Sequence, residues 1–366
     1  MRAGRLRWAV AAVLAGLLLP RSSQAVKPLS RFGAARPVRI EDFRPHPIDG
    51  EGYHEEWSVS IYMQDESYLG VDFVVSNVGF GDRKGAVRAK YRSPSQQETR
   101  CIAEYDEGEW SYRKSGGFRL FYGENRLEGD LEGLRAVVRC RRLSFDLKLV
   151  NEVSPLKPGS GVLHFGDGDG QYSMVFPSPR SRVAGTVEVE GKTRTIDGTG
   201  HVSHSRTTMY PHKQFRRWFR FKRISRQVSI ILAEFETESP YGHARRGWAL
   251  VLDPKGRMLA TARVNFRFEG FIKDDRSEEG YAIPRQVRFV AAEGESQVRG
   301  TLRMTGLKSK SDPTSDLSPA MRTFIRHFTR PADYRIRCDY AIDVKTAGDE
   351  RRFQGKGDYQ FMYVNP

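Results

Sequence analysis

Alternation between apolar and polar side chains, with a period of two, runs through most of this chain from residue 57 onward. Trp57–Met63 (WSVSIYM) is the first such run, and Gly133–Leu149 and Phe219–Lys222 repeat the pattern. This is the period of a β-strand that buries one face. Gly, Asp and Pro separate the runs about every ten residues, a spacing typical of barrels and sandwiches rather than of alternating α/β folds. We therefore expect an all-β protein.

The number of runs, roughly fifteen, is enough for two antiparallel barrels of about eight strands each. One segment, Leu317–Phe328, has a helical pattern instead, with Ser318 as a candidate N-cap and Pro319 in the first turn. Its apolar side chains fall on one helix face: Met321, Phe324, Ile325 and Phe328. We expect one short helix near the C-terminus.

The N-terminal segment has the composition of a secretory signal peptide. Arginines precede an apolar run, Trp8–Leu19, that is too short to cross a bilayer comfortably, and Ser23-Gln24-Ala25 offers a cleavage site. We therefore expect export to the periplasm or the medium. The expected division of the chain is a signal peptide over 1–25, a linker or N-terminal arm over 26–47, an N-terminal domain over 48–205 and a C-terminal domain over 206–366.

The chain is basic, with a formal net charge of +15, and removing the four arginines of residues 1–25 leaves +11. A basic surface attracts nucleic acid or anionic lipid. Because export argues against nucleic acid, we expect no nucleic-acid partner. The charge then supports either peripheral contact with an anionic membrane or only solubility. We expect the protein to be a monomer.

Three cysteines are present, and an odd number leaves at least one thiol unpaired. Cys101 and Cys140 both lie in strand-like runs of the first half and are the natural pair if a disulfide forms, whereas Cys338 lies far along the chain. A barrel of this length buries a sufficient core without a covalent crosslink. We therefore favour three free cysteines.

Three histidines, His201, His204 and His212, fall close together after a glycine-rich start at Gly198. A metal site is disfavoured, because residues three apart on a strand face opposite sides and no cluster of Asp, Glu or Cys is nearby. We expect neither a metal nor a cofactor. Two roles stay open: general acid–base catalysis by His204 or His212, or hydrogen bonding at a turn or barrel mouth.

Two further motifs have both a functional and a structural interpretation. Arg216–Arg223 mixes cations with aromatic side chains, which suits a membrane interface but also an ordinary strand with Trp218 buried. His164–Gly170 (HFGDGDG) is similar to part of a calcium loop but lacks the glutamate that completes such a loop. We expect a turn between strands at this second motif.

Short motifs in the middle of the chain resemble the Svf1-like family of fungal survival-factor proteins, which is related to AttH-like proteins and carotenoid 1,2-hydratases. The resemblance covers most of Trp57–Val364 and is carried by Trp57–Asn77, Val183-x-Gly185-Thr186, Gly191-Lys192-Thr193, Tyr210-Pro211-His212-Lys213, Trp218–Phe221, Glu234–Thr237 and Ser239–Gly242. Gly198-x-Gly200-His201-x-Ser203-His204 is similar to a hydratase motif but has Ser203 where those enzymes have aspartate.

The resemblance implies two lipocalin-like (calycin-type) antiparallel barrels in tandem, binding of a ceramide-like lipid, and a role in oxidative-stress survival. Our leading hypothesis is that the chain binds and shields a hydrophobic ligand, a lipid or an isoprenoid, in the cell envelope. The alternative is a cofactor-free isomerase, cyclase or hydratase acting on a polyene or terpenoid, with His204 and His212 catalytic. In either case we expect the ligand to lie inside a barrel. The residues expected to line this cavity are Trp57, Tyr62, Trp110, His201, His204, Tyr210, His212 and Trp218.

Overall fold

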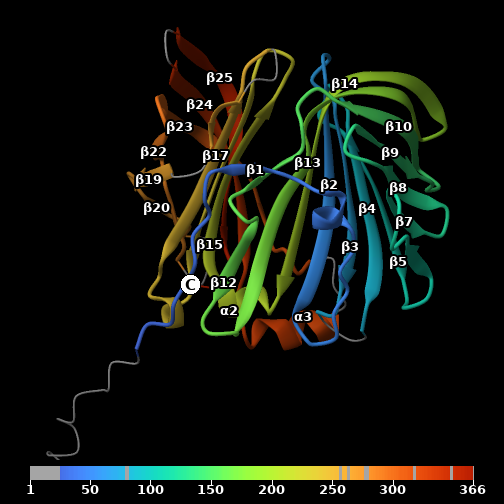
Figure 1. Cartoon of the computed structure of the whole chain (residues 1–366), viewed down its shortest axis with the longest axis horizontal. Helices are drawn as coiled ribbons and strands as arrows, with labels where there is room; N and C mark the ends of the chain where they lie inside the picture. The colour runs from blue at the N-terminus through green and yellow to red at the C-terminus, as the bar shows by residue number, and fades with distance from the viewer. Residues whose placement is uncertain are drawn as a thin grey trace, which may run out of the picture.

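The structure, a computed structural model, describes residues 25–78, 82–254, 258–261, 264–275, 280–315, 319–346 and 349–365. The expected signal peptide, residues 1–25, lies outside this part of the chain except for Ala25. The described residues are almost entirely β-strands, in two large antiparallel sheets that stand side by side (Figure 1). The expected all-β fold is confirmed.

A 14-stranded sheet forms the first domain. Its strands are β1 (Ala35–Pro37), β2 (Tyr53–Met63), β3 (Tyr68–Ser76), β4 (Lys84–Arg92), β5 (Glu98–Tyr105), β6 (Trp110–Tyr112), β7 (Phe118–Tyr122), β8 (Asn125–Gly129), β9 (Gly133–Val138), β10 (Leu143–Asn151), β11 (Leu156–Pro158), β12 (Val162–Phe165), β13 (Gly170–Val189) and β14 (Lys192–Thr208).

A 9-stranded sheet forms the second domain. Its strands are β15 (Phe215–Ile224), β16 (Ser229–Thr237), β17 (Arg245–Leu252), β18 (Met258–Thr261), β19 (Val264–Glu269), β22 (Gln286–Glu293), β23 (Ser296–Ser311), β24 (Ala332–Thr346) and β25 (Asp349–Tyr363). The remaining elements are β20 (Ile272–Lys273), β21 (Ala282–Ile283), the 3-10 helices η1 (Ile40–Phe43) and η2 (Ser239–Tyr241), and the α-helices α2 (Pro211–Gln214) and α3 (Pro319–Arg326).

Both sheets close in the same way, because a strand early in each domain pairs with the last strand of that domain. In the first domain β2 pairs with β14, and in the second β15 pairs with β25. Each sheet therefore curls into a nearly closed antiparallel barrel, and the two lipocalin-like barrels follow each other along the chain. The first sheet ends at Thr208, so the boundary expected between 205 and 206 falls inside β14.

The helix expected over 317–328 is present as α3, Pro319–Arg326, with proline at its first position. Residues 316–318, including the candidate N-cap Ser318, lie outside the described part of the chain. Neither described α-helix has the length or the apolar composition that a membrane-crossing helix needs.

Aromatic rings fill the interior of the first barrel. Trp57 is fully buried and its ring lies 6.0 Å from that of Phe118, while Phe73 packs against Tyr122 at the same separation. Phe43, which belongs to the N-terminal arm, covers this core: its ring lies 5.0 Å from Phe118 and its carbonyl accepts a hydrogen bond from Trp57 Nε1. The inward positions of the alternating strands thus form a packed core.

The second barrel is filled in the same way. The ring of Phe219 lies 5.1 Å from Phe266, and Phe266 lies 5.9 Å from Phe289. Phe221 packs on Tyr340 at 5.5 Å. We expected a ligand inside a barrel, but side chains occupy these two interiors.

A third apolar cluster joins the two domains. The ring of Phe215 from β15 lies 5.7 Å from Phe165 of β12 and 5.5 Å from Tyr172 of β13. Arg180, only 1% exposed, adds a polar contact between the domains, because its Nη1 donates a hydrogen bond to the carbonyl oxygen of Asp253 at 2.6 Å. These contacts fix one barrel against the other.

A disulfide links Cys101 on β5 to Cys140, which follows β9, and Cys338 is a buried free thiol. Our preference for three free cysteines was therefore wrong. β5 is an end of the ladder, and β9 lies on the far side of the same sheet. The disulfide therefore links this edge strand to the other side of the barrel. The strand pattern in the sequence does not show which strand lies at the edge of the sheet.

Candidate functional site

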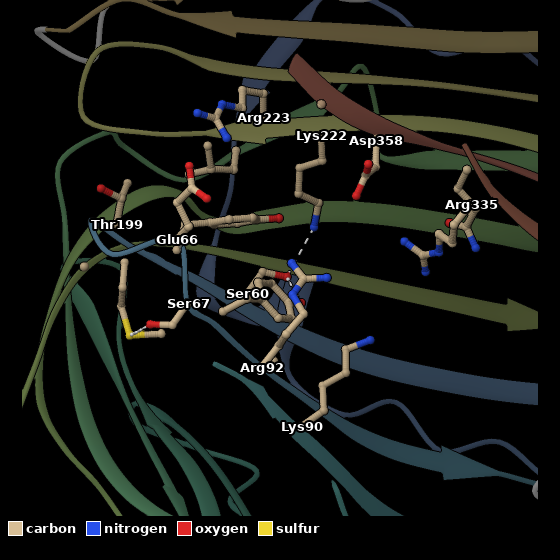
Figure 2. A pocket seen from close by; sticks show the side chains of 18 of the residues that line it. Ser60, Glu66, Ser67, Lys90, Arg92, Thr199, Lys222, Arg223, Arg335 and Asp358 are labelled. Carbon is tan, nitrogen blue, oxygen red and sulfur yellow. Dashed lines mark hydrogen bonds between the residues drawn. The ribbon is translucent and has the colours of Figure 1, made fainter. Parts of the chain in front are cut away.

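A cavity of about 1200 Å³ lies between the two barrels. The outer faces of β2, β3 and β4 line one side, and β15, β24 and β25 line the other. Figure 2 shows Lys90 and Arg92 from the first domain and Lys222 and Arg335 from the second pointing into the same space. We call this cavity the interdomain cleft.

The two-residue period of the strands explains why the interdomain cleft is polar. On β2, Trp57, Val59 and Ile61 point into the first barrel and are buried. The alternate residues of the same strand, Glu56, Ser58, Ser60 and Tyr62, point to the other side and line the cleft. Each strand therefore contributes side chains to the barrel core from one face and to the interdomain cleft from the other.

Two carboxylates meet in the interdomain cleft around one hydroxyl group. Ser58 Oγ lies 3.2 Å from Glu56 Oε1 and also hydrogen-bonds Asp72 Oδ1 on the neighbouring strand β3. A hydroxyl has one proton to donate and can accept two. Asp72 can therefore donate to Ser58 when it is protonated, while Ser58 donates to Glu56.

The two carboxyl groups differ in acidity. Burial and the nearby charge of Glu56 raise the pKa of Asp72 to about 6. Burial would also raise the pKa of Glu56, but His54, whose Nε2 lies 3.9 Å from Oε2, and the charge of Arg220 outweigh it, so the pKa falls. A neutral acid beside an ionised carboxylate is the usual arrangement for general acid–base chemistry.

Lys222 faces this pair from the second domain. Its Nζ lies 3.4 Å from Ser60 Oγ (Figure 2). Burial, followed by the charge of Arg220, lowers the pKa of Lys222 to about 7, although Asp72 and Glu56 act in the opposite direction. The amine therefore changes charge near neutral pH.

A second polar group lies inside the first barrel. Glu55 is fully buried; it accepts hydrogen bonds from the Tyr53 hydroxyl and from the backbone N–H of His46, and its Oε1 lies 2.8 Å from His204 Nε2. The ring of His204 stacks on Trp57 with 4.7 Å between centroids. Burial would raise the pKa of Glu55, but the bonds to His204 and Tyr53 lower it overall.

The structure distributes the eight expected ligand-binding residues over several places. Tyr62 lines the interdomain cleft, with its ring 5.2 Å from Tyr68. Trp57 and His204 lie in the core of the first barrel, and Trp110 is buried near one of its rims with Nε1 donating to the carbonyl of Arg83.

The other four lie on the side of the interdomain apolar cluster. His201 is buried beside Phe176 with Nδ1 3.1 Å from the carbonyl oxygen of Pro179, and Trp218 packs on Phe215 at 4.5 Å. Tyr210 stacks on His212 at 5.4 Å near the junction of the domains. Of the two expected catalytic histidines, His204 is thus enclosed in the core and His212 is half-buried outside the cleft.

Sequence reasoning missed Glu56, Ser58, Asp72 and Lys222. The signal was present, because each occupies a polar position in an alternating run, but many polar positions of strands face solvent. The stretch Arg216–Arg223 shows the difficulty: it forms β15, and its outward residues turn toward the first domain. That contact depends on how the barrels pack.

The remaining motif of the sequence has a structural role. Residues 166–169 form the expected turn between β12 and β13, and Asp169 pairs with Lys27 at 2.8 Å. Within the described residues, no three His, Cys, Asp or Glu side chains gather as metal ligands would.

Comparison with known proteins supports the fold and the resemblance. A profile of the Svf1 family matches residues 145–318. A crystal structure of CghA with Sch210972 is 10% identical and aligns over 93% of this chain and 99% of that chain with a TM-score of 0.60. No curated protein sequence matches the chain significantly.

Two other crystal structures are similar over the whole fold. A protein assigned as AttH from Nitrosomonas europaea is 11% identical, with a TM-score of 0.55 over 92% of this chain and 99% of that chain. Kievitone hydratase from Nectria haematococca is 14% identical, with a TM-score of 0.53 over 93% of this chain and 98% of that chain. At these identities the similarities show a shared tandem-barrel fold.

Proposed function

For a chain that resembles the Svf1 family over residues 145–318, we propose a cofactor-free enzyme that binds a small organic molecule in the interdomain cleft and moves a proton on it. The reaction class is that of a hydratase, isomerase or cyclase. The observation that carries the proposal is the shared hydroxyl of Ser58 between Asp72 and Glu56. Kievitone hydratase, a protein of the same fold, supports this class.

The chemistry follows from the two carboxyl groups. Protonated Asp72 donates its proton to a carbon–carbon double bond or a carbonyl oxygen of the substrate. Ionised Glu56 stabilises the positive charge that develops and then accepts a proton, from the attacking water in a hydration or from a substrate carbon in an isomerisation or cyclisation. Ser58 returns the proton between the two carboxyl groups, and no redox step is needed.

The second candidate function is the leading hypothesis from the sequence, a carrier that shields an apolar ligand in the envelope of a stressed cell. Apolar atoms of Tyr62, Met63 and Ile224 line part of the interdomain cleft and favour it. The cleft volume, about 1200 Å³, is enough for a lipid-sized or terpenoid-sized molecule. Export remains a proposal that the Cys101–Cys140 disulfide supports, because such bonds persist in oxidising compartments.

Product formation separates the two functions. The purified protein is incubated with a small-molecule extract of its own source cells, and bound and free molecules are compared by mass spectrometry. The enzyme function predicts a new product, either an isomer or an adduct of one water. In Asp72→Asn the product is lost while the substrate still binds.

The matched control is Asp339→Asn, which changes an exposed aspartate at the border of the same cleft. It is expected to leave product formation unchanged. Full product formation by Asp72→Asn would overturn the enzyme proposal. A single bound molecule, recovered unaltered with all variants, would establish the carrier instead.

A further inference from the structure

Basic side chains outnumber acidic ones around the interdomain cleft, twelve to six. Five of the basic groups line the cleft from three strands: Lys90 and Arg92 on β4, Arg220 and Lys222 on β15, and Arg335 on β24. Figure 2 shows four of them, Lys90, Arg92, Lys222 and Arg335, around one space. Throughout the described parts of the chain, no carboxylate oxygen lies within 4.0 Å of the side-chain nitrogens of Lys90, Arg92, Arg220 or Lys222. Their charge is therefore not neutralised by direct ion pairs.

The mutual repulsion of these groups contributes to the lowered pKa of both lysines. Burial, and then the charge of Arg335, lower the pKa of Lys90. Arg220 and Arg335 act on Lys222 in the same way, and Asp72 offsets only part of the effect on each lysine. Like charges held together at low dielectric cost free energy unless an anion joins them.

One of the cations also has an unused donor. Arg92 Nε is buried and has no hydrogen-bond partner in the described structure. The ring of Tyr68 lies under both cations of β4, 5.4 Å from the guanidinium carbon of Arg92 and 5.8 Å from Lys90 Nζ. This ring holds the two cations in place without neutralising them.

We propose that the cleft recognises an oxyanion, a carboxylate or a phosphate, on its organic ligand, bound between Lys90 and Arg92 of the first domain and Lys222 and Arg335 of the second. The inference rests on the proposed function, since it assigns the substrate class of that site. The apolar ligand expected from the sequence then becomes an amphipathic acid or phosphate ester. Both domains contribute charge, so binding the oxyanion bridges them.

Two fluorescent probes with the same aromatic skeleton test this directly. 8-Anilino-1-naphthalenesulfonate carries an oxyanion, and N-phenyl-1-naphthylamine is the same molecule without the sulfonate. The sulfonate probe is expected to bind at least about tenfold more tightly, the worth of one hydrogen bond to a charged group. Its affinity is also expected to fall as salt is added.

Variants locate the effect. Arg92→Met and Lys222→Met are each expected to weaken the anionic probe about tenfold and to leave the neutral probe unchanged. Lys148→Met is the control, because Lys148 is exposed on β10 and outside the cleft. Displacement of the probe by dodecanoate or by dodecyl phosphate, with dodecanol as the neutral comparison, identifies the preferred oxyanion.

Equal affinity for the two probes, or equal losses in Lys148→Met and Lys222→Met, would overturn the oxyanion inference. The proposed proton-transfer function would stand or fall separately, because it is measured by product formation in Asp72→Asn. A chain that forms product yet binds both probes equally has the proposed function but a neutral substrate.

Discussion

The buried pair of Glu55 and His204 gives the sharpest test of how the first barrel is built. Glu55 is 0% exposed and His204 3% exposed, and their side chains meet at 2.8 Å. Glu55 is a buried carboxylate, and removing a partner that compensates a buried charge typically costs about 3–5 kcal/mol. His204→Phe keeps a ring on Trp57 but removes the nitrogen. We expect it to lower the free energy of unfolding by about 3 kcal/mol or more.

A double-mutant cycle separates the pair from its surroundings. Glu55→Gln keeps the shape of the carboxylate and is expected to cost a similar amount. The double variant should lose less than the sum of the single losses, with a coupling of about 1.5–3 kcal/mol, because neither partner is then left alone. Urea unfolding, followed by circular dichroism and tryptophan fluorescence, measures all four proteins.

The same pair predicts a pH dependence. The pKa of Glu55 is lowered in the folded protein, so its carboxylate stabilises the fold above the ordinary glutamate pKa of about 4.3. This stabilisation is lost as the pH falls through the lower folded value. The stability gap between wild type and Glu55→Gln should therefore narrow in acid. A loss below about 1 kcal/mol in His204→Phe, together with lost ligand turnover, would refute a structural role for His204 and restore its catalytic role.

Three further predictions concern other parts of the molecule. Cys101→Ser removes a disulfide between residues 39 apart and should lower the free energy of unfolding by about 4 kcal/mol in the loop-closure model. In urea titrations, a reductant should destabilise the wild type by the same amount and leave the variant unchanged. Lys222→Met should raise the melting temperature below about pH 7, where the poorly solvated ammonium of Lys222 is charged. This gain should shrink at higher pH, because the wild-type lysine then loses its proton. A gain in melting temperature that grows with pH would contradict the lowered pKa of Lys222. Turnover that uses protonated Asp72 should decline as the pH rises through about 6 in a pH–rate profile, and a flat profile between pH 5 and about 8 would exclude Asp72 as the proton donor.

The strand pattern predicted the architecture because each strand buries one face. Trp57, Val59 and Ile61 had to share an interior, and the glycine and proline turns marked where one strand ends and the next begins. Helix α3 was predicted from its proline and apolar spacing, which are local features. These properties depend on near neighbours in the sequence, so they can be derived without coordinates.

The site depends on an arrangement that local patterns do not contain. Ser58 and Asp72 become neighbours through the register of β2 with β3, and Lys222 reaches Ser60 on the same face of β2 only because β15 packs against the first domain. Sequence reasoning favoured aromatic and histidine side chains, such as Trp57 and His204, as the visible chemistry. In the structure both contribute to the core, and the charged outer faces of ordinary strands form the cleft.

The central claim is that the ligand lies between the barrels. A crystal structure of the protein with the small molecule that co-purifies from its source cells tests this claim most directly. The account predicts density in the interdomain cleft, with a polar group of the ligand against Lys222 and Arg92 and its reactive part near Asp72. A ligand enclosed within either barrel, with Trp57 or Phe219 displaced to admit it, would contradict the account.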